Sequence, residues 1–224
     1  MTDLLIQPSK LKGDVHIPPS KSMAHRAVIS ASLAEGQSTI TNIQLSDDIK
    51  ATISAMESLG TQITIEDDGD RSKLVIQGIG KQGSKEDRTI DANESGSTLR
   101  FLIPIASLFE GASRFIGRGK LGIRPLDTYE EMFNGQGLRY EPSGTDQLDL
   151  TIEGSLKPGR YEMEGNVSSQ FITGLLFTLP LLEEDSLIQI TTELESVGYL
   201  ELTLEVLKDF GIAITFNEEK RQFM

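Results

Sequence analysis

The chain contains no cysteine among its 224 residues. This absence excludes disulfides, thiolate metal ligands and a cysteine nucleophile within this sequence. Histidine is scarce as well: His16 and His25 are the only two, too few for a histidine-rich metal site. The sequence also has no run of 18 or more apolar residues, so we expect no membrane-spanning helix.

The sequence also has no recognisable targeting leader and is poor in basic residues. The first residues, MTDLLIQPSKLKGD, show neither a basic region followed by an apolar one nor an Arg- and Ser-rich leader, so we expect a cytoplasmic protein. The 21 Lys and Arg against 34 Asp and Glu give a formal net charge of -13. Such a charge disfavours nucleic-acid binding, and any phosphate site must be built locally from a few cations and backbone amides.

The sequence repeats itself in three sections. ASLAEG at 31–36 recurs as ASLFEG at 106–111, and counting back 15 residues from each glutamate reaches Ser20 and Ser95. A third, more divergent copy runs from Ser168 to Glu183. Each serine opens a long apolar stretch, which predicts a buried helix.

Each copy continues with a short β-type run, an amphipathic helix and a hairpin. The amphipathic helices are predicted to end near Gly60, Gly137 and Gly211. The hairpins are predicted to turn around Asp67–Asp70, Pro142–Gly144 and Asn217–Lys220. Pro104 should kink the second buried helix, and Pro180 should kink or end the third.

The third hairpin reaches Met224 before its second strand is complete. Because a domain rarely ends in the middle of a hairpin, we expect a fragment of a longer protein. A natural C-terminus with a short last strand is the alternative.

These patterns predict a mixed α/β fold, an α+β arrangement of three βαβαββ repeats with buried helices and outer sheets. The expected repeats cover residues 18–92, 93–165 and 166–224, the last one truncated, within one domain at 18–224. Residues 1–17 precede the first repeat and have no counterpart in the others.

Small polar residues begin each buried helix: Ser20–Ser22, Ser95–Thr98 and Ser168–Gln170. The unpaired N–H groups and partial positive charge of a helix start favour an anion, and Gly96 allows a close approach of the backbone. The alternative is that these serines are ordinary N-caps.

Basic residues lie close to the helix starts or in the Gly-rich loop at 117–124. They are Lys21, Arg26, Arg100, Lys120 and Arg124. Because Lys and Arg seldom occupy apolar helices without a partner, we interpret Lys21, Arg26 and Arg124 as ligand contacts. Arg100 is the one we expect to pair with a carboxylate. No residues are spaced as a metal site.

Five motifs follow one another along the chain: Pro19-Ser20-Lys21-Ser22-x-x-x-Arg26, Glu94-Ser95-Gly96-Ser97-Thr98-Leu99-Arg100, Arg124-Pro125-Leu126, Ser168-Ser169-Gln170 and Ser196-x-x-Tyr199. Their combination and order resemble the 5-enolpyruvylshikimate-3-phosphate synthase family over the whole chain. The resemblance implies one domain of the two-domain "inside-out" enolpyruvyl transferase fold, with the active site between the domains. Residues 1–17 would belong to the absent second domain.

The family transfers the enolpyruvyl group of phosphoenolpyruvate to the 5-hydroxyl of shikimate 3-phosphate, in the shikimate pathway to chorismate and the aromatic amino acids. The resemblance therefore implies a monomeric transferase without metal or organic cofactor, and a glyphosate target. The carboxylate that acts in proton transfer lies in the absent domain. This fragment should accordingly bind shikimate 3-phosphate without turning it over.

The resemblance implies eight contacts with shikimate 3-phosphate: Lys21, Ser22, Arg26, Ser168, Ser169, Gln170, Ser196 and Tyr199. Ser168 and Ser169 would bind its 3-phosphate, while Lys21 and Gln170 would also reach phosphoenolpyruvate. Lys21 is in addition a candidate for proton transfer. Gly96 and Arg124 would contact phosphoenolpyruvate, Arg124 through a bidentate fork. Glu94 departs from the family, in which asparagine is common at this position.

Two other functions fit part of the pattern. UDP-N-acetylglucosamine enolpyruvyl transferases share the Arg-Pro-x-Asp turn at Arg124–Asp127, but they usually carry Lys-Asn in place of Lys21-Ser22, and a loop cysteine. A non-catalytic phosphometabolite-binding domain would use the same helix starts. An RNA-processing relative is disfavoured by the net charge of -13.

Overall fold

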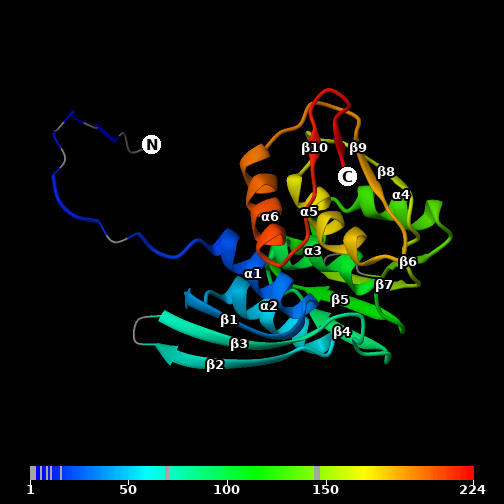
Figure 1. Cartoon of the computed structure of the whole chain (residues 1–224), viewed down its shortest axis with the longest axis horizontal. Helices are drawn as coiled ribbons and strands as arrows, with labels where there is room; N and C mark the ends of the chain where they lie inside the picture. The colour runs from blue at the N-terminus through cyan, green and yellow to red at the C-terminus, as the bar shows by residue number, and fades with distance from the viewer. Residues whose placement is uncertain are drawn as a thin grey trace.

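A computed structural model describes residues 4–5, 7–8, 10, 12–15, 17–68, 71–143 and 147–224 (Figure 1). Helices lie inside and sheets outside, which confirms the predicted mixed α/β class. The first unit contains α1 (Lys21–Leu33), β1 (Glu35–Ile43), α2 (Asp47–Ser58), β2 (Gln62–Asp68) and β3 (Arg71–Ile79). The second contains β4 (Arg88–Asp91), α3 (Gly96–Ala106), β5 (Ser113–Gly117), the 3-10 helix η1 (Gly119–Ile123), α4 (Asp127–Gly135), β6 (Arg139–Pro142) and β7 (Leu148–Glu153). The third contains β8 (Arg160–Met163), α5 (Ser169–Thr178), the 3-10 helix η2 (Leu179–Leu181), β9 (Leu187–Ile190), α6 (Val197–Asp209), β10 (Phe216–Asn217) and β11 (Gln222–Phe223).

Each unit has its own sheet, and the three sheets share one strand order. The orders are β4-β5-β7-β6 in the second unit and β8-β9-β11-β10 in the third. The first unit has β1-β3-β2, so its described residues lack a strand equivalent to β4 or β8. β4 is parallel to β5 and β8 is parallel to β9, whereas the other neighbours are antiparallel.

Strand pairing groups some residues differently from the repeat boundaries expected above. β4 lies within the expected first repeat at 18–92, but it pairs with β5 of the second unit. β8 lies within 93–165, but it pairs with β9 of the third. The repeated motif that guided the boundaries starts at the helices, and a strand preceding each helix carries no such motif.

The helices α1, α3 and α5 form the centre of the core, as their apolar composition predicted. Almost every residue of α3 and α5 is buried, and Phe101 of α3 meets Phe177 of α5 edge-on with ring centroids 5.9 Å apart. Gly174 allows this close packing, because a Cβ there would lie 2.7 Å from the Arg100 carbonyl oxygen. Pro104 lies in the last turn of α3 and cannot donate to the Arg100 carbonyl, which instead accepts from the Tyr129 hydroxyl at 2.6 Å. Pro180 follows the end of α5 at Thr178, as predicted.

The amphipathic helices α2, α4 and α6 cover this core. Each helix ends two residues before its predicted glycine, and that glycine has a positive φ: 108° at Gly60, 70° at Gly137 and 84° at Gly211. Left-handed backbone at this position favours glycine. Leu126, the last residue of the Arg124-Pro125-Leu126 motif, directly precedes α4 as its N-cap.

The hairpins differ in length. β2–β3 and β6–β7 form the first two, although Gly69, Asp70 and Gly144 of the predicted turns lie outside the described residues. The third hairpin does have a second strand: β11 has two residues and pairs with both β10 and β9. Within the described ranges, no helix is long and apolar enough to cross a membrane.

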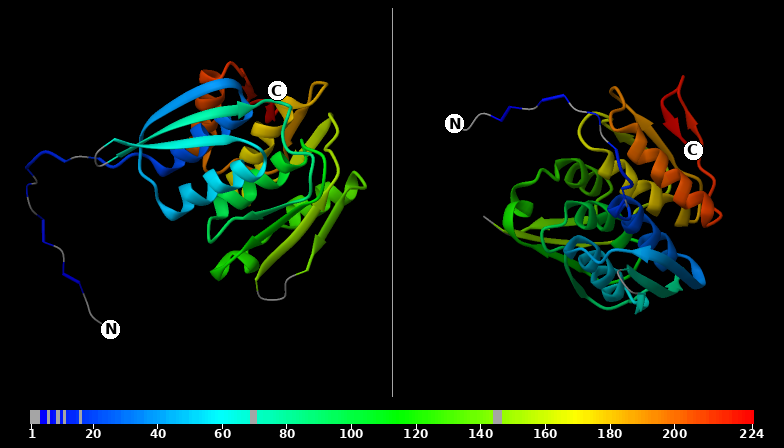
Figure 2. Two further views of the ribbon diagram at one scale, coloured as in Figure 1. Left: turned by 90° about the horizontal axis from the view of Figure 1, so that it is seen from below. Right: turned by 90° about the vertical axis from the view of Figure 1, so that its left-hand side faces the viewer.

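The described residues before α1 form no strand and run away from the body of the molecule (Figure 2). Four apolar side chains of this segment are exposed: Leu4 85%, Leu5 84%, Val15 83% and Ile17 82%.

Candidate anion-binding site

The three buried helices begin with a serine N-cap, as the sequence suggested. Ser20 accepts from the Met23 N–H at 3.3 Å, Ser95 from Thr98 at 3.2 Å and Ser168 from Gln170 at 3.3 Å. The capping interpretation is therefore correct for all three serines. A cap satisfies one N–H, and the other first-turn N–H groups stay available to an anion.

Gln170 links the starts of α3 and α5. Its Oε1 accepts from Arg100 Nη1 at 3.0 Å, and its Nε2 donates to Ser97 Oγ at 2.9 Å. Ser169, beside it, is buried at the first position of α5, and Ser168 is half-buried. The amide of Gln170 thus fixes the separation of two helix starts.

The expectation that Arg100 pairs with a carboxylate is wrong. Its Nη2 donates to the Pro125 carbonyl oxygen at 3.0 Å, and its guanidinium carbon lies 4.7 Å from the centroid of Phe171. The partners come from α5 and from the loop before α4, and residues so far apart in sequence could not be paired by inspection. Neutral acceptors leave the positive charge of Arg100 uncompensated.

Arg124 adds a second cation at the start of α3. Its side chain crosses Gly96 so closely that a Cβ there would lie 3.2 Å from Arg124 Cζ and nearer still to Nη1. Burial lowers the pKa of Arg100, and the charge of Arg124 lowers it further. Neither arginine has an acidic partner within the described part of the chain. An anion bound here would relieve this repulsion.

Arg26 joins α1 to α6. It is 3% exposed and donates to Thr203 Oγ1 at 2.8 Å, the Ser22 carbonyl at 2.8 Å and the Tyr199 carbonyl at 2.9 Å. Burial lowers its pKa to about 10. A guanidinium has five N–H groups, so three of these are used by the protein and two remain for a ligand.

Lys21 lies at the first position of α1 and pairs with Asp48 of α2, with Nζ and Oδ2 2.5 Å apart. Asp48 was not expected at the site. An acidic residue in the first turn of α2 is common because it complements the helix dipole, and nothing local relates Asp48 to a lysine 27 residues away. Because the Lys21 side chain is 57% exposed, an anion can compete for it.

A buried network supports these helix starts from behind. The hydroxyls of Thr52 and Thr98 are 2.7 Å apart, Thr98 donates to Ser95 Oγ at 2.8 Å, and His25 Nδ1 lies 2.7 Å from Thr52 Oγ1. Burial lowers the pKa of His25 to about 4, so this imidazole is neutral near pH 7. The network ties α1, α2 and α3 together.

The remaining predicted residues lie at the rim. Tyr199 is 51% exposed, and Ser196 precedes α6 with a left-handed φ of 55° and no side-chain capping bond. Lys120 and Glu94 are exposed, and Glu94 lies against Gly119, where an added Cβ would be 2.8 Å from its Cδ. The structure therefore places Arg124 against Gly96, and Gln170 against Arg100 and Ser97, but it shows no hydrogen bond from the Ser196 side chain.

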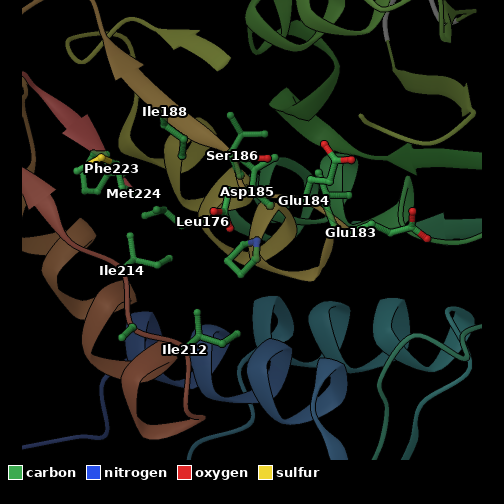
Figure 3. Close-up of a pocket in the computed structure, with 15 residues that line it drawn as sticks. Leu176, Glu183, Glu184, Asp185, Ser186, Ile188, Ile212, Ile214, Phe223 and Met224 are labelled. Atoms are coloured by element: carbon green, nitrogen blue, oxygen red, sulfur yellow. The ribbon is translucent and has the colours of Figure 1, made fainter. Parts of the chain in front are cut away.

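A hollow of about 290 Å³ lies elsewhere, beside the C-terminal half of α5 (Figure 3). Apolar Leu176, Ile188 and Ile214 line it, and the exposed acidic run Glu183–Asp185 forms part of its wall. None of the predicted site residues lines it, and its carboxylates do not suit an anion. Within the described ranges, no cluster of His, Asp and Glu could hold a metal ion.

Comparisons with known proteins identify the family of this chain. The family model for EPSP synthase (3-phosphoshikimate 1-carboxyvinyltransferase) matches residues 5–224. The chain is 59% identical to the 3-phosphoshikimate 1-carboxyvinyltransferase of Clostridium beijerinckii, over 97% of this chain and 50% of the relative. It is also 59% identical to that of Clostridioides difficile, over 98% of this chain and 51% of the relative.

A solved structure of EPSP synthase from Acinetobacter baumannii shares the fold, with a TM-score of 0.76. The identity is 22%, over 94% of this chain and 46% of that one. The chain spans about half the length of the curated relatives it matches. On the strength of the family match and these relatives, the chain belongs to the EPSP synthase family.

Proposed function

We propose that this chain is the substrate-binding half of an enzyme that transfers the enolpyruvyl group of phosphoenolpyruvate to the 5-hydroxyl of shikimate 3-phosphate. The observation that carries the proposal is the group of capped helix starts joined by Gln170, with Arg100 and Arg124 lacking acidic partners. Helix starts and uncompensated guanidinium groups bind phosphate and carboxylate groups well. Both proposed substrates carry such groups.

The assigned contacts divide between the two ligands. Shikimate 3-phosphate would lie across the starts of α1 and α5, held by Lys21, Ser22, Arg26, Ser168, Ser169 and Gln170, with Ser196 and Tyr199 at the rim. Phosphoenolpyruvate would lie at the start of α3, against Gly96 and Arg124. A ligand anion that takes the place of the Asp48 carboxylate beside Lys21 would break the exposed Lys21–Asp48 ion pair. Binding would therefore be coupled to the loss of this pair.

This half would be inactive alone. The proposed acid–base carboxylate lies in the other half, and general acid–base catalysis contributes roughly 10²–10⁴-fold in rate. We propose that residues 1–17 belong to that other half, and that the complete protein is a cytoplasmic monomer. Turnover by the purified 224-residue chain, free of any longer form, would contradict this division.

Calorimetric titration with shikimate 3-phosphate tests the proposed site. Lys21→Met should weaken binding about 10- to 150-fold, because a charge-assisted hydrogen bond contributes roughly 1.5–3 kcal/mol. Lys50→Met is the matched control, since Lys50 is an equally exposed lysine, at 60%, that pairs with Asp47 on α2. Equal affinities for the two variants would refute the assigned role of Lys21.

A further inference from the structure

The outer helices α2, α4 and α6 each insert one hydroxyl group between two of the buried helices. The three residues that carry these hydroxyls are fully buried: Thr52, Tyr129 and Thr203. Thr52 joins α1 to α3, Tyr129 joins α3 to α5, and Thr203 joins α5 to α1. A buried hydroxyl costs free energy unless it is hydrogen-bonded, so each of these positions requires the partners that it has.

The partners of the three hydroxyls differ. Tyr129 donates to two backbone carbonyl oxygens, at 2.6 and 3.1 Å, and Thr52 meets the side chains of the buried network that contains His25. Among the three, Thr203 is the one that bonds the side chain of a residue assigned to the ligand, because its Oγ1 accepts from Arg26 Nε at 2.8 Å. Thr203 lies four residues beyond Tyr199 and outside every motif found in the sequence.

The bonding capacity of the Thr203 hydroxyl is used inside the protein. A hydroxyl has one proton and two lone pairs. The proton goes to the Tyr199 carbonyl oxygen at 2.9 Å, one turn back in α6. The oxygen accepts from Arg26 Nε and lies 3.3 Å from the hydroxyl oxygen of Thr173 on α5. Valine has the same shape but none of these bonds, so the hydroxyl can be tested apart from the volume of the side chain.

The Arg26 guanidinium is held at each of its three nitrogens. Nε donates to Thr203, Nη1 to the Ser22 carbonyl oxygen at 2.8 Å, and Nη2 to the Tyr199 carbonyl oxygen at 2.9 Å. Its Cζ also lies over the ring of Phe101, 5.4 Å from the centroid. Because a guanidinium is a rigid planar fork, three anchored nitrogens fix the direction of the N–H that remains on each of Nη1 and Nη2.

The bond to Thr203 is the anchor that a substitution can remove. Without the hydroxyl, the buried Nε–H would lack an acceptor, and the guanidinium would have to turn to find one. Arg26 has no acidic partner within the part of the chain that the structure describes, so no ion pair would hold it in place. A guanidinium that must be reordered on binding costs affinity.

We propose that Thr203 is a positioning residue for the substrate, whose buried hydroxyl fixes the Arg26 guanidinium so that two N–H groups are presented to shikimate 3-phosphate. This inference rests on the proposed function, which assigns that ligand to Arg26. Thr203 is fully buried and acts through Arg26 and not by touching the ligand. α6 packs against both α1 and α5 (Figure 1), so the same hydroxyl also links three helices whose starts carry assigned contacts.

Calorimetric titration of the 224-residue chain with shikimate 3-phosphate tests this role. Thr203→Val should weaken binding at least about fivefold, whereas Thr203→Ser, which keeps the hydroxyl, should stay within about twofold of the unmodified chain. Thr178→Val is the matched control and should also stay within about twofold. Thr178 is equally buried, and its hydroxyl donates one turn back to the Gly174 carbonyl oxygen at 2.8 Å, with no bond to Arg26.

A second titration separates positioning from a general loosening of the fold. Phosphoenolpyruvate is titrated into Thr203→Val saturated with shikimate 3-phosphate. Its affinity should change less than about twofold, because Gly96 and Arg124 lie at the start of α3 and not against Thr203. Equal losses of affinity for the two ligands would make the role of Thr203 structural and would overturn the inference.

NMR of the ligand-free chain tests the contact between Thr203 and Arg26 independently of any ligand. The Arg26 Nε–H should exchange with water at least about tenfold faster in Thr203→Val than in the unmodified chain or in Thr178→Val. Unchanged exchange would show that the hydroxyl does not hold the guanidinium. Failure of the unmodified chain to bind shikimate 3-phosphate would instead contradict the proposed function, and the exchange rates would still decide whether Thr203 holds Arg26. Equal affinities of Thr203→Val and Thr178→Val for shikimate 3-phosphate would overturn the inference outright.

Discussion

Replacement of Gly96 by alanine should weaken phosphoenolpyruvate binding without unfolding the protein. The added Cβ would lie 3.2 Å from Arg124 Cζ and closer to Nη1, inside ordinary van der Waals contact. Gly96 has no left-handed φ, so alanine fits the backbone, and the exposed guanidinium can swing away. The change therefore acts on the position of Arg124 and not on the core.

The magnitude follows from the contact that is lost. A charge-assisted hydrogen bond contributes about 1.5–3 kcal/mol, which corresponds to about 10- to 150-fold in affinity. Calorimetric titration of phosphoenolpyruvate into the chain saturated with shikimate 3-phosphate measures it. Gly135→Ala is the control, because no atom lies within 4 Å of a Cβ at that position. A Gly96→Ala affinity within twofold of the control would refute the placement of Arg124.

Two further predictions concern stability. Burial lowers the pKa of His25 from 6.5 to about 4, so the unfolded chain binds a proton in this range before the folded one does. The contribution of neutral His25 to the free energy of unfolding is fully present above pH 6.5 and is lost as the pH falls to 4. The loss is about 3 kcal/mol, since the pKa difference of 2.5 corresponds to 1.36 kcal/mol per unit. Urea titrations at several pH values should show this loss, and His25→Gln should abolish it. Gly174→Ala should lower the free energy of unfolding by about 1–3 kcal/mol through overpacking, since its Cβ would lie 2.7 Å from the Arg100 carbonyl. A urea midpoint for Gly174→Ala equal to that of Gly135→Ala would contradict it.

The elements that local chemistry decides could be predicted from the sequence. The serines at 20, 95 and 168 are N-caps, and the glycines at 60, 137 and 211 follow C-caps with positive φ. Both signals depend on residues within one helical turn. The repeat of buried and amphipathic helices followed from the same short-range periodicity.

What depends on distant partners could not be predicted. Arg100 was expected to meet a carboxylate, but its side-chain partner Gln170 is 70 residues away and its other acceptor is a backbone carbonyl. Asp48 was missed for the same reason, because only the packing of α1 on α2 brings it to Lys21. Sequence patterns also did not show that the described part of the first sheet has one strand fewer than the other two, because strand pairing joins residues far apart in the chain.

Titration of this chain with shikimate 3-phosphate and, separately, with unphosphorylated shikimate tests the central claim most directly. If the helix starts and their arginines form a phosphate site, shikimate 3-phosphate should bind at least about 100-fold more tightly than shikimate, and added salt should reduce that advantage. Equal affinities for the two compounds, in a chain whose fold is intact, would contradict the account.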